Sequence, residues 1–358
     1  MSHNKELTAL LNDVRQEAES AQGEEALRPI FTKLKEFKTR SGAIKYDNSG
    51  KWIALCIFAA VGLLTVLVYF SVPGVMGLVS ERLGDAVFFI IGGYAIIPVG
   101  VLIAIGFSNS EIDSISESIF WKDVCLDNQL SEINISGQEK SLYHRFCADF
   151  SDFRGRGDED QYVKHMVRGT YHGGVETKLS YDYYVFHYVV VTYVPTSETY
   201  TDSKGNTHTR IVMKRVETTH YRYGIMTDFP EAKGIAAVSG GGSWDYPVKW
   251  DPTSTEFSST FEAYSDNQMA AAKFWKPAVV LAAVELAKHF SDPNIEINRT
   301  GKLCISFADS DVLELDREFS IADPEEFEKE IFSRLELPKP KALMQFVEIA
   351  RKHNDRNF

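Results

Sequence analysis

The sequence predicts an α+β fold that combines a two-helix transmembrane hairpin with a cytoplasmic domain of antiparallel sheet and C-terminal helices. Three observations lead to this fold class. Two segments near the N-terminus carry no charge over about 20 residues each, residues from Tyr162 onward are rich in Val, Tyr and Phe, and the last third of the chain returns to helical periodicity. The expected organisation is amphipathic helices over 1–51, a hairpin over 52–107, a helical connector over 108–160 and an α+β domain over 161–358.

Residues 1–51 are predicted to form two amphipathic helices that separate near Gly23. The second helix has a basic polar face and leads toward the first apolar segment. Two interpretations stay open: it lies on anionic lipid, or its apolar face packs on the C-terminal domain or on another subunit. The prediction depends on apolar residues that recur every three or four positions, namely Leu7, Leu10, Leu11 and Val14, then Leu27, Ile30, Phe31, Leu34 and Phe37.

The two uncharged segments are the basis for the transmembrane prediction. The first, 52–72, would extend roughly 32 Å as a helix, close to the thickness of a bilayer's hydrocarbon core. Its Leu, Ile, Phe and Val residues are worth on the order of −4 to −7 kcal/mol on insertion scales. The second, 86–107, contains Pro98, which membrane helices tolerate with a kink.

A short loop, Pro73–Asp85, joins the two segments, so both chain termini are expected on one side of the membrane. Gly93, Gly100 and Ala104 share one helical face, where a neighbouring helix can approach closely. We expect this face to pack on the first helix; an oligomer contact is the alternative. Positive residues stay cytoplasmic, and the 20 residues directly before the first helix hold six of them, which predicts that both termini are cytoplasmic: Lys33, Lys35, Lys38, Arg40, Lys45 and Lys51.

Composition excludes some functions. The net charge is −12 and the pI about 5.3, so a nucleic-acid partner is not expected. The four cysteines are far apart and form no disulfide framework, which fits a reducing compartment. The polar N-terminus is not a cleavable signal peptide.

The domain from 161 onward begins with strand-forming sequence. Two long Val- and Tyr-rich runs flank a polar stretch whose sharpest point is Lys204-Gly205-Asn206. This pattern predicts an antiparallel ribbon that projects from the domain.

Helical sequence follows the ribbon. Ser265 to Gln268 has the spacing of a capping box, and Pro277 is expected to divide the next helical run. A strand hairpin should turn at Thr300-Gly301, and Asp311–Asp316 reads as another strand. Two helices, over 323–335 and 341–353, close the chain.

The stretch from Phe261 to Phe307, "FEAYSDNQMAAAKFWKPAVVLAAVELAKHF" followed by "GKLCISF", resembles a bacterial membrane protein family known as domain-of-unknown-function 3137. "HYRYGIMTDFPEAKG", His220–Gly234, resembles a second segment of that family, and the similarity covers roughly residues 110–345. The resemblance implies a multi-pass protein of the bacterial inner membrane and supplies no activity, substrate or catalytic residue. It also implies a neighbouring helical membrane protein of the LemA type as a candidate partner.

No motif predicts a catalytic, cofactor-binding or metal-binding residue. The histidines of the strand-rich part lack ligand spacing and cysteine partners. His144 and Cys147 lie three residues apart on one predicted helix, a geometry that rarely gives a catalytic pair. "SGGGS", residues 239–243, is not followed by the Lys-Ser or Lys-Thr of a phosphate loop.

The sequence therefore predicts a membrane-anchored protein-interaction or scaffold protein without a cofactor. Its expected partners are the lipid bilayer and a protein, either a different chain or further copies of itself. The alternative is a membrane-bound enzyme such as a hydrolase, with a site assembled from residues distant in sequence. A transport subunit is disfavoured because the apolar segments hold no acid, base or histidine.

Overall fold

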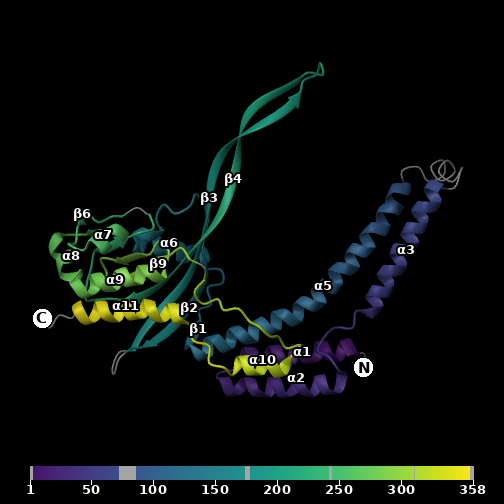
Figure 1. The fold of residues 1–358 in the computed structure, drawn as a ribbon, viewed down its shortest axis with the longest axis horizontal. Helices are drawn as coiled ribbons and strands as arrows, with labels where there is room; N and C mark the ends of the chain where they lie inside the picture. The colour runs from purple at the N-terminus through teal and green to yellow at the C-terminus, as the bar shows by residue number, and fades with distance from the viewer. Residues whose placement is uncertain (1–2, 72–85, 174–177, 242–243, 310, 355–358) are drawn as a thin grey trace. The chain divides into compact units, whose positions relative to one another are not determined.

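The computed structural model describes residues 3–71, 86–173, 178–241, 244–309 and 311–354. The chain divides into two compact units. The first comprises 1–127 together with 316–335, and the second comprises 128–315 together with 336–358. The first unit is helical and the second carries a nine-stranded antiparallel sheet, so the fold is α+β (Figure 1).

The first unit is built from amphipathic helices. Of the helical region predicted over 1–51, residues 3–20 and 24–41 are helical and separate around Gly23, whereas residues 42–48 form no helix. The apolar face of α2 is buried within this chain, since the ring of Phe31 contacts Phe327 and Phe332. The elements are α1 (His3–Ser20), η1 (Glu24–Leu27), α2 (Arg28–Ser41), α3 (Ser49–Ser71), α5 (Ala86–Asp127) and α10 (Pro324–Ile331).

The predicted transmembrane hairpin is wrong. The apolar segments belong to α3 and α5, but no helix within the described residues has both the length and the unbroken apolar composition that a bilayer crossing requires. α5 continues to Asp127, and its second half carries charge: Asp113 and Glu117 pair with Arg317. The predictions of a multi-pass protein and of an inner-membrane location with cytoplasmic termini are wrong for the same reason. The predicted loop 73–85 lies outside the described residues.

The second unit is organised around one sheet with the strand order β1-β2-β3-β4-β9-β8-β5-β7-β6, in which all neighbours are antiparallel. Alternation of apolar and polar residues explains why these segments are strands. The strands are β1 (Leu130–Glu132), β2 (Glu159–His172), β3 (Lys178–Thr201), β4 (Thr207–Asp228), β5 (Ile235–Val238), β6 (Val248–Trp250), β7 (Glu262–Ser265), β8 (Asn294–Ile297) and β9 (Lys302–Phe307).

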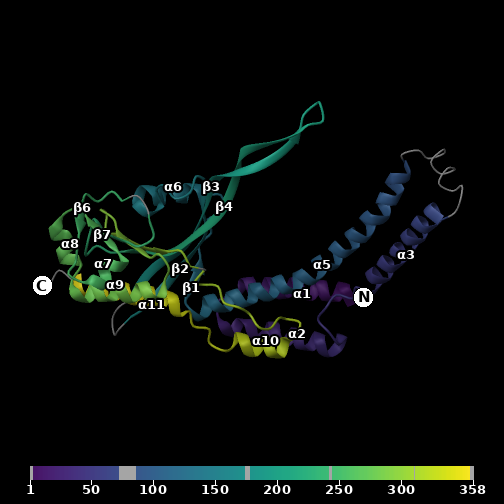
Figure 2. The ribbon, with the colours of Figure 1, turned by 45° about the horizontal axis from the view of Figure 1, so that its top comes forward.

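Helices cover both faces of this sheet (Figure 2). α6 packs on β2 over an aromatic core, and on the other face Tyr171 of β2 donates its hydroxyl to Glu348 of α11. The helical elements are α6 (Glu139–Asp149), η2 (Ser151–Phe153), α7 (Thr255–Thr260), α8 (Gln268–Phe274), α9 (Pro277–His289) and α11 (Pro338–Asn354).

Two local predictions are confirmed and two are wrong. Pro277 begins α9 after the break that follows α8, and β8 and β9 turn at Gly301, whose φ of 85° favours glycine. The N-cap of α8 is Asn267, whose side chain accepts the N–H of Ala270. The predicted N-cap, Ser265, is instead the last residue of β7. The segment 311–316 forms no strand; the Asp311 carboxylate instead accepts the hydroxyl of Tyr183.

Candidate functional site

The outer part of the β3–β4 ribbon is almost entirely exposed. β3 and β4 pair continuously from Asp182↔Met226 to Thr201↔Thr207. β2 accompanies β3 only as far as Val189, and β9 pairs with β4 only from Tyr223. Beyond these points the two strands continue alone, as both views show (Figures 1 and 2).

The tip of the ribbon has the chemistry predicted from the sequence. Gly205 adopts a φ of 85°, and its N–H donates to the carbonyl of Asp202 over 3.0 Å. The Asp202 carboxylate accepts the N–H groups of Lys204 and Asn206 over 2.9 and 2.8 Å. This turn fixes the register of the ribbon.

One face of the ribbon carries a continuous row of exposed apolar side chains. Pro195 lies directly opposite Met213, with Tyr193 and Ile211 beside them on the same face. Ile211, Tyr193 and Met213 are 78%, 60% and 59% exposed. We call Tyr193, Pro195, Ile211 and Met213 the apolar strip.

The opposite face of the ribbon combines charged side chains with exposed valines. Arg210 pairs with Glu198 across the ladder over 2.8 Å, and its guanidinium lies 5.4 Å from the ring of Tyr200. Lys214 lies on this same face, opposite Val194. The two faces of the ribbon therefore offer different chemistry to a partner.

The ribbon is anchored at its base. Arg215 of β4 pairs with Glu159 at the start of β2. The ring of His187 stacks on Tyr162 with the centroids 4.5 Å apart, and the Asp158 carboxylate accepts the N–H of Val191 over 2.8 Å. These contacts attach the ribbon to the sheet before it leaves the core.

A buried ionic network lies where the ribbon joins the sheet. The Asp152 carboxylate is 3.3 Å from Nε of Arg222 and 2.5 Å from Nη2 of Arg156. Ser306 and Asn294 donate to the same carboxylate over 2.5 and 2.6 Å. Burial alone would raise the pKa of Asp152, but the two guanidinium groups outweigh it and hold that pKa well below its usual range.

A second buried carboxylate, Glu296, completes this network. Its oxygens accept the N–H groups of Ser151 and Asp152 over 2.9 and 3.1 Å and the hydroxyl of Tyr246 over 2.8 Å. Burial raises the pKa of Glu296, and these donors oppose the shift. Since protein groups already surround both carboxylates, the network acts as a clamp between η2 and the central strands.

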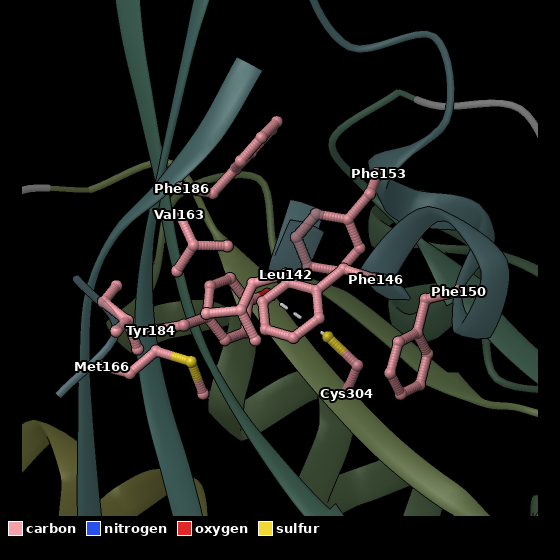
Figure 3. Close-up of a cluster of buried hydrophobic side chains, with 10 residues drawn as sticks. Leu142, Phe146, Phe150, Phe153, Val163, Met166, Tyr184, Phe186 and Cys304 are labelled. Carbon is pink, nitrogen blue, oxygen red and sulfur yellow. Dashed lines mark hydrogen bonds between the residues drawn. The ribbon is translucent and has the colours of Figure 1, made fainter. Parts of the chain in front are cut away.

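The core beneath α6 is aromatic. Figure 3 shows Phe146, Phe153 and Tyr184 pointing toward one another, with the Tyr184 hydroxyl 3.3 Å from Sγ of Cys304. The Cys147 thiol donates to the carbonyl of Phe153, with its sulfur 3.7 Å from that oxygen. This contact gives the thiol a structural role in the core. Within the described residues, no group of three His, Cys, Asp or Glu side chains could hold a metal ion.

A polar groove of about 460 Å³ opens beside α6. Most charged side chains around it form pairs with one another: Arg168 with Asp182 over 2.7 Å and Lys302 with Asp149 over 3.2 Å. Its charges are thus largely satisfied within the protein. The groove is a weaker candidate for binding than the ribbon.

The glycine-rich loop is used for packing. Arg156 donates to the carbonyls of Gly240 and Gly241 over 2.9 and 3.1 Å. A Cβ at Gly240 would lie 2.5 Å from the carbonyl oxygen of Asp292, so only glycine fits there. The remaining predicted loop residues, 242–243, lie outside the described residues.

The small residues predicted for helix packing lie on α5. A Cβ at Gly100 would meet nothing within 4 Å, and Ala104 is exposed, although its carbonyl accepts Lys51 over 3.1 Å. The surroundings of Gly93 lie outside the described side chains. A packing or oligomer contact at these residues stays a prediction.

Comparison of the chain with protein-family models, with curated proteins and with solved structures gave no match. The resemblance to domain-of-unknown-function 3137 and the partner it implies therefore stay predictions.

Proposed function

We propose that this protein is an interaction or scaffold protein that holds a protein partner on the apolar strip of its β3–β4 ribbon. The observation that carries the proposal is the exposure of Ile211, Met213 and Tyr193 on a ribbon with no other element against that face in the described part of the chain. A two-stranded ribbon is marginally stable by itself, and exposed apolar edge regions promote aggregation. Exposed apolar side chains of this kind mark interaction surfaces.

The partner we propose is a different protein chain. The resemblance in the sequence points to a helical protein of the LemA type as the first candidate. A second copy of this chain is the other outcome that the experiment distinguishes.

The alternative function, a hydrolase, has less support from the geometry. An acid–base site needs titratable groups that converge on an accessible cavity. Asp152 and Glu296 are enclosed by protein donors, and the acids of the groove beside α6 include two, Asp149 and Asp182, that are paired with bases.

Co-purification with matched variants tests the proposal. The double variant Ile211→Ser/Met213→Ser removes the apolar strip, whereas Val194→Ser/Val216→Ser removes exposed apolar groups from the opposite face. Tagged full-length chains are isolated from cells that naturally make the protein, and co-eluting proteins are quantified by mass spectrometry beside a differently tagged second copy.

We expect one protein partner to be lost from the strip variant and kept by the control variant. Equal recovery of all co-eluting proteins with the wild type and both variants would contradict the proposal. If the differently tagged copy were the only protein recovered, the apolar strip would bind a second copy of this chain and not a different protein.

A further inference from the structure

We infer that the outer edge of β4, residues 207–221, binds an extended segment of the partner as an added β-strand, and that this segment, which lies outside the partner's helices, alternates apolar and acidic residues. The inference rests on the proposed function and adds the mode of binding and the chemistry of the partner. Addition of a strand to an exposed sheet edge is a recurring way of binding extended segments.

The first step is that this edge is unpaired. Within the described residues, β4 pairs only with β3 from Thr207 to Arg222, and β9 takes the outer edge from Tyr223 onward. The side chains along the edge are mostly exposed. An incoming strand would therefore extend an existing sheet.

The second step concerns the direction of the backbone groups. The N–H of Val191 and the carbonyl of Val189 both point away from β4, because each forms a hydrogen bond with Asp158. The ladder pairs odd-numbered residues of β3 with odd-numbered residues of β4 and has no register shift. Odd-numbered residues of β4, such as Thr209 and Met213, therefore present their N–H and C=O groups to the outer edge.

The third step is that the two edges of the ribbon differ. On the outer edge of β3 the N–H of Val191 already donates to the Asp158 carboxylate, and Pro195 has no N–H to donate. β4 contains no proline. Proline on an edge strand blocks strand addition, so the fold closes one edge and leaves the other available.

The fourth step gives the partner's chemistry. A strand beside β4 would direct alternate side chains to the two faces of the ribbon. On one face they meet Ile211 and Met213, and on the other they meet Lys214 and Arg210, whose guanidinium also pairs with Glu198. Lys214 has no acidic partner within the described residues. Alternating apolar and acidic residues match both faces.

The test uses fluorescein-labelled peptides as probes. One heptapeptide alternates valine and glutamate, and a second alternates valine and lysine. Fluorescence anisotropy measures their binding to the full-length protein. We expect the glutamate peptide to bind at least about ten-fold more tightly than the lysine peptide, because a lysine side chain that faces Lys214 is repelled.

Matched proline variants locate the binding edge. Thr209→Pro removes an outward N–H from β4, and Thr199→Pro removes one from β3 on the same rung of the ladder. Both changes spare the β3–β4 hydrogen bonds, and thermal unfolding checks that the ribbon persists. Loss of the edge hydrogen bond should weaken the binding of the glutamate peptide to Thr209→Pro about ten-fold. Its binding to Thr199→Pro should equal its binding to the wild type.

Equal weakening by both proline variants, or no binding of either peptide to the wild type, would overturn strand addition. Neither outcome decides the proposed function, because Ile211→Ser/Met213→Ser keeps every backbone N–H and tests the apolar strip separately. Loss of the partner with the serine variant and its retention with Thr209→Pro would assign binding to the apolar strip without strand addition.

Discussion

Arg222 and Asp152 form a buried ion pair, with Nε 3.3 Å from Oδ2 and with only 2% and 1% of their side chains exposed. Removal of one partner leaves the other charge buried without compensation, which typically costs about 3–5 kcal/mol. Asp152→Asn is therefore expected to lower the free energy of unfolding by that amount in urea titrations.

The matched control for this prediction is Asp182→Asn, which breaks the largely solvated pair with Arg168. Pairs of that kind contribute at most about 1 kcal/mol. If the two variants lost similar small amounts of stability, the clamp between η2 and the central strands would not be a main source of stability.

Asp123 predicts a pH dependence. Its side chain is buried on α5, and neither carboxylate oxygen has a hydrogen-bond partner among the residues that the structure describes. Burial, followed by the charges of Asp127 and Glu24, raises the pKa of Asp123 to about 8. The folded state then holds a proton that the unfolded chain releases near its ordinary pKa of 3.8.

This linkage makes the first unit less stable as the pH rises from about 4 to about 8. In the Asp123→Asn variant this position cannot ionise, so the destabilisation at high pH is removed. The substitution should therefore raise the melting temperature at pH 8.5 more than at pH 5.5. Calorimetry at both values checks it. Equal shifts at the two pH values would show that Asp123 does not titrate in this range.

Gly224 predicts a steric effect in the sheet. A Cβ at this position would lie 2.3 Å from the carbonyl oxygen of Ile305 and 2.5 Å from the hydroxyl of Tyr184. Because the carbonyl is backbone, Gly224→Ala should destabilise the fold by about 1–3 kcal/mol. Gly50→Ala on α3, where the Cβ meets open space, should stabilise it by up to about 1 kcal/mol. Changes of the same sign in thermal melts would refute this reading of the two sites.

Pro195 is expected to protect the free edge of β3. Pro195→Val restores an outward N–H at this edge and should increase self-association, which light scattering measures. Thr196→Val adds a similar side chain on the opposite face and directs its N–H toward β4, so it serves as the control. No difference between these variants would remove the argument that the two ribbon edges differ.

Much of the second unit follows from local sequence patterns. Alternating Val and Tyr residues predict β3, the chemistry of Gly205 predicts the ribbon tip, and Pro277 predicts the break before α9. Each of these signals lies within a few residues of the structure that it specifies.

The buried network could not be predicted in the same way. Asp152, Arg222, Asn294 and Ser306 are separated by 70 or more residues in most of their contacts, and no spacing rule links them. Tertiary contacts also outweighed a local pattern at 311–316. The sequence of this segment is typical of a strand, but Asp311 accepts the hydroxyl of Tyr183 and the segment forms no strand. The transmembrane prediction was based on apolar composition alone, and no helix among the described residues meets the length and apolar composition of a bilayer crossing.

The exposed apolar strip is the centre of the functional proposal, and site-specific photocrosslinking tests it most directly. A photoreactive residue at Ile211 is compared with one at Val194, which lies on the opposite face of the same ribbon. In cells that naturally make the protein, the residue at 211 should capture one defined protein, and the residue at 194 should capture little of it. Absence of any product from position 211, or equal products from both positions, would contradict the assignment of this face as the partner-binding surface.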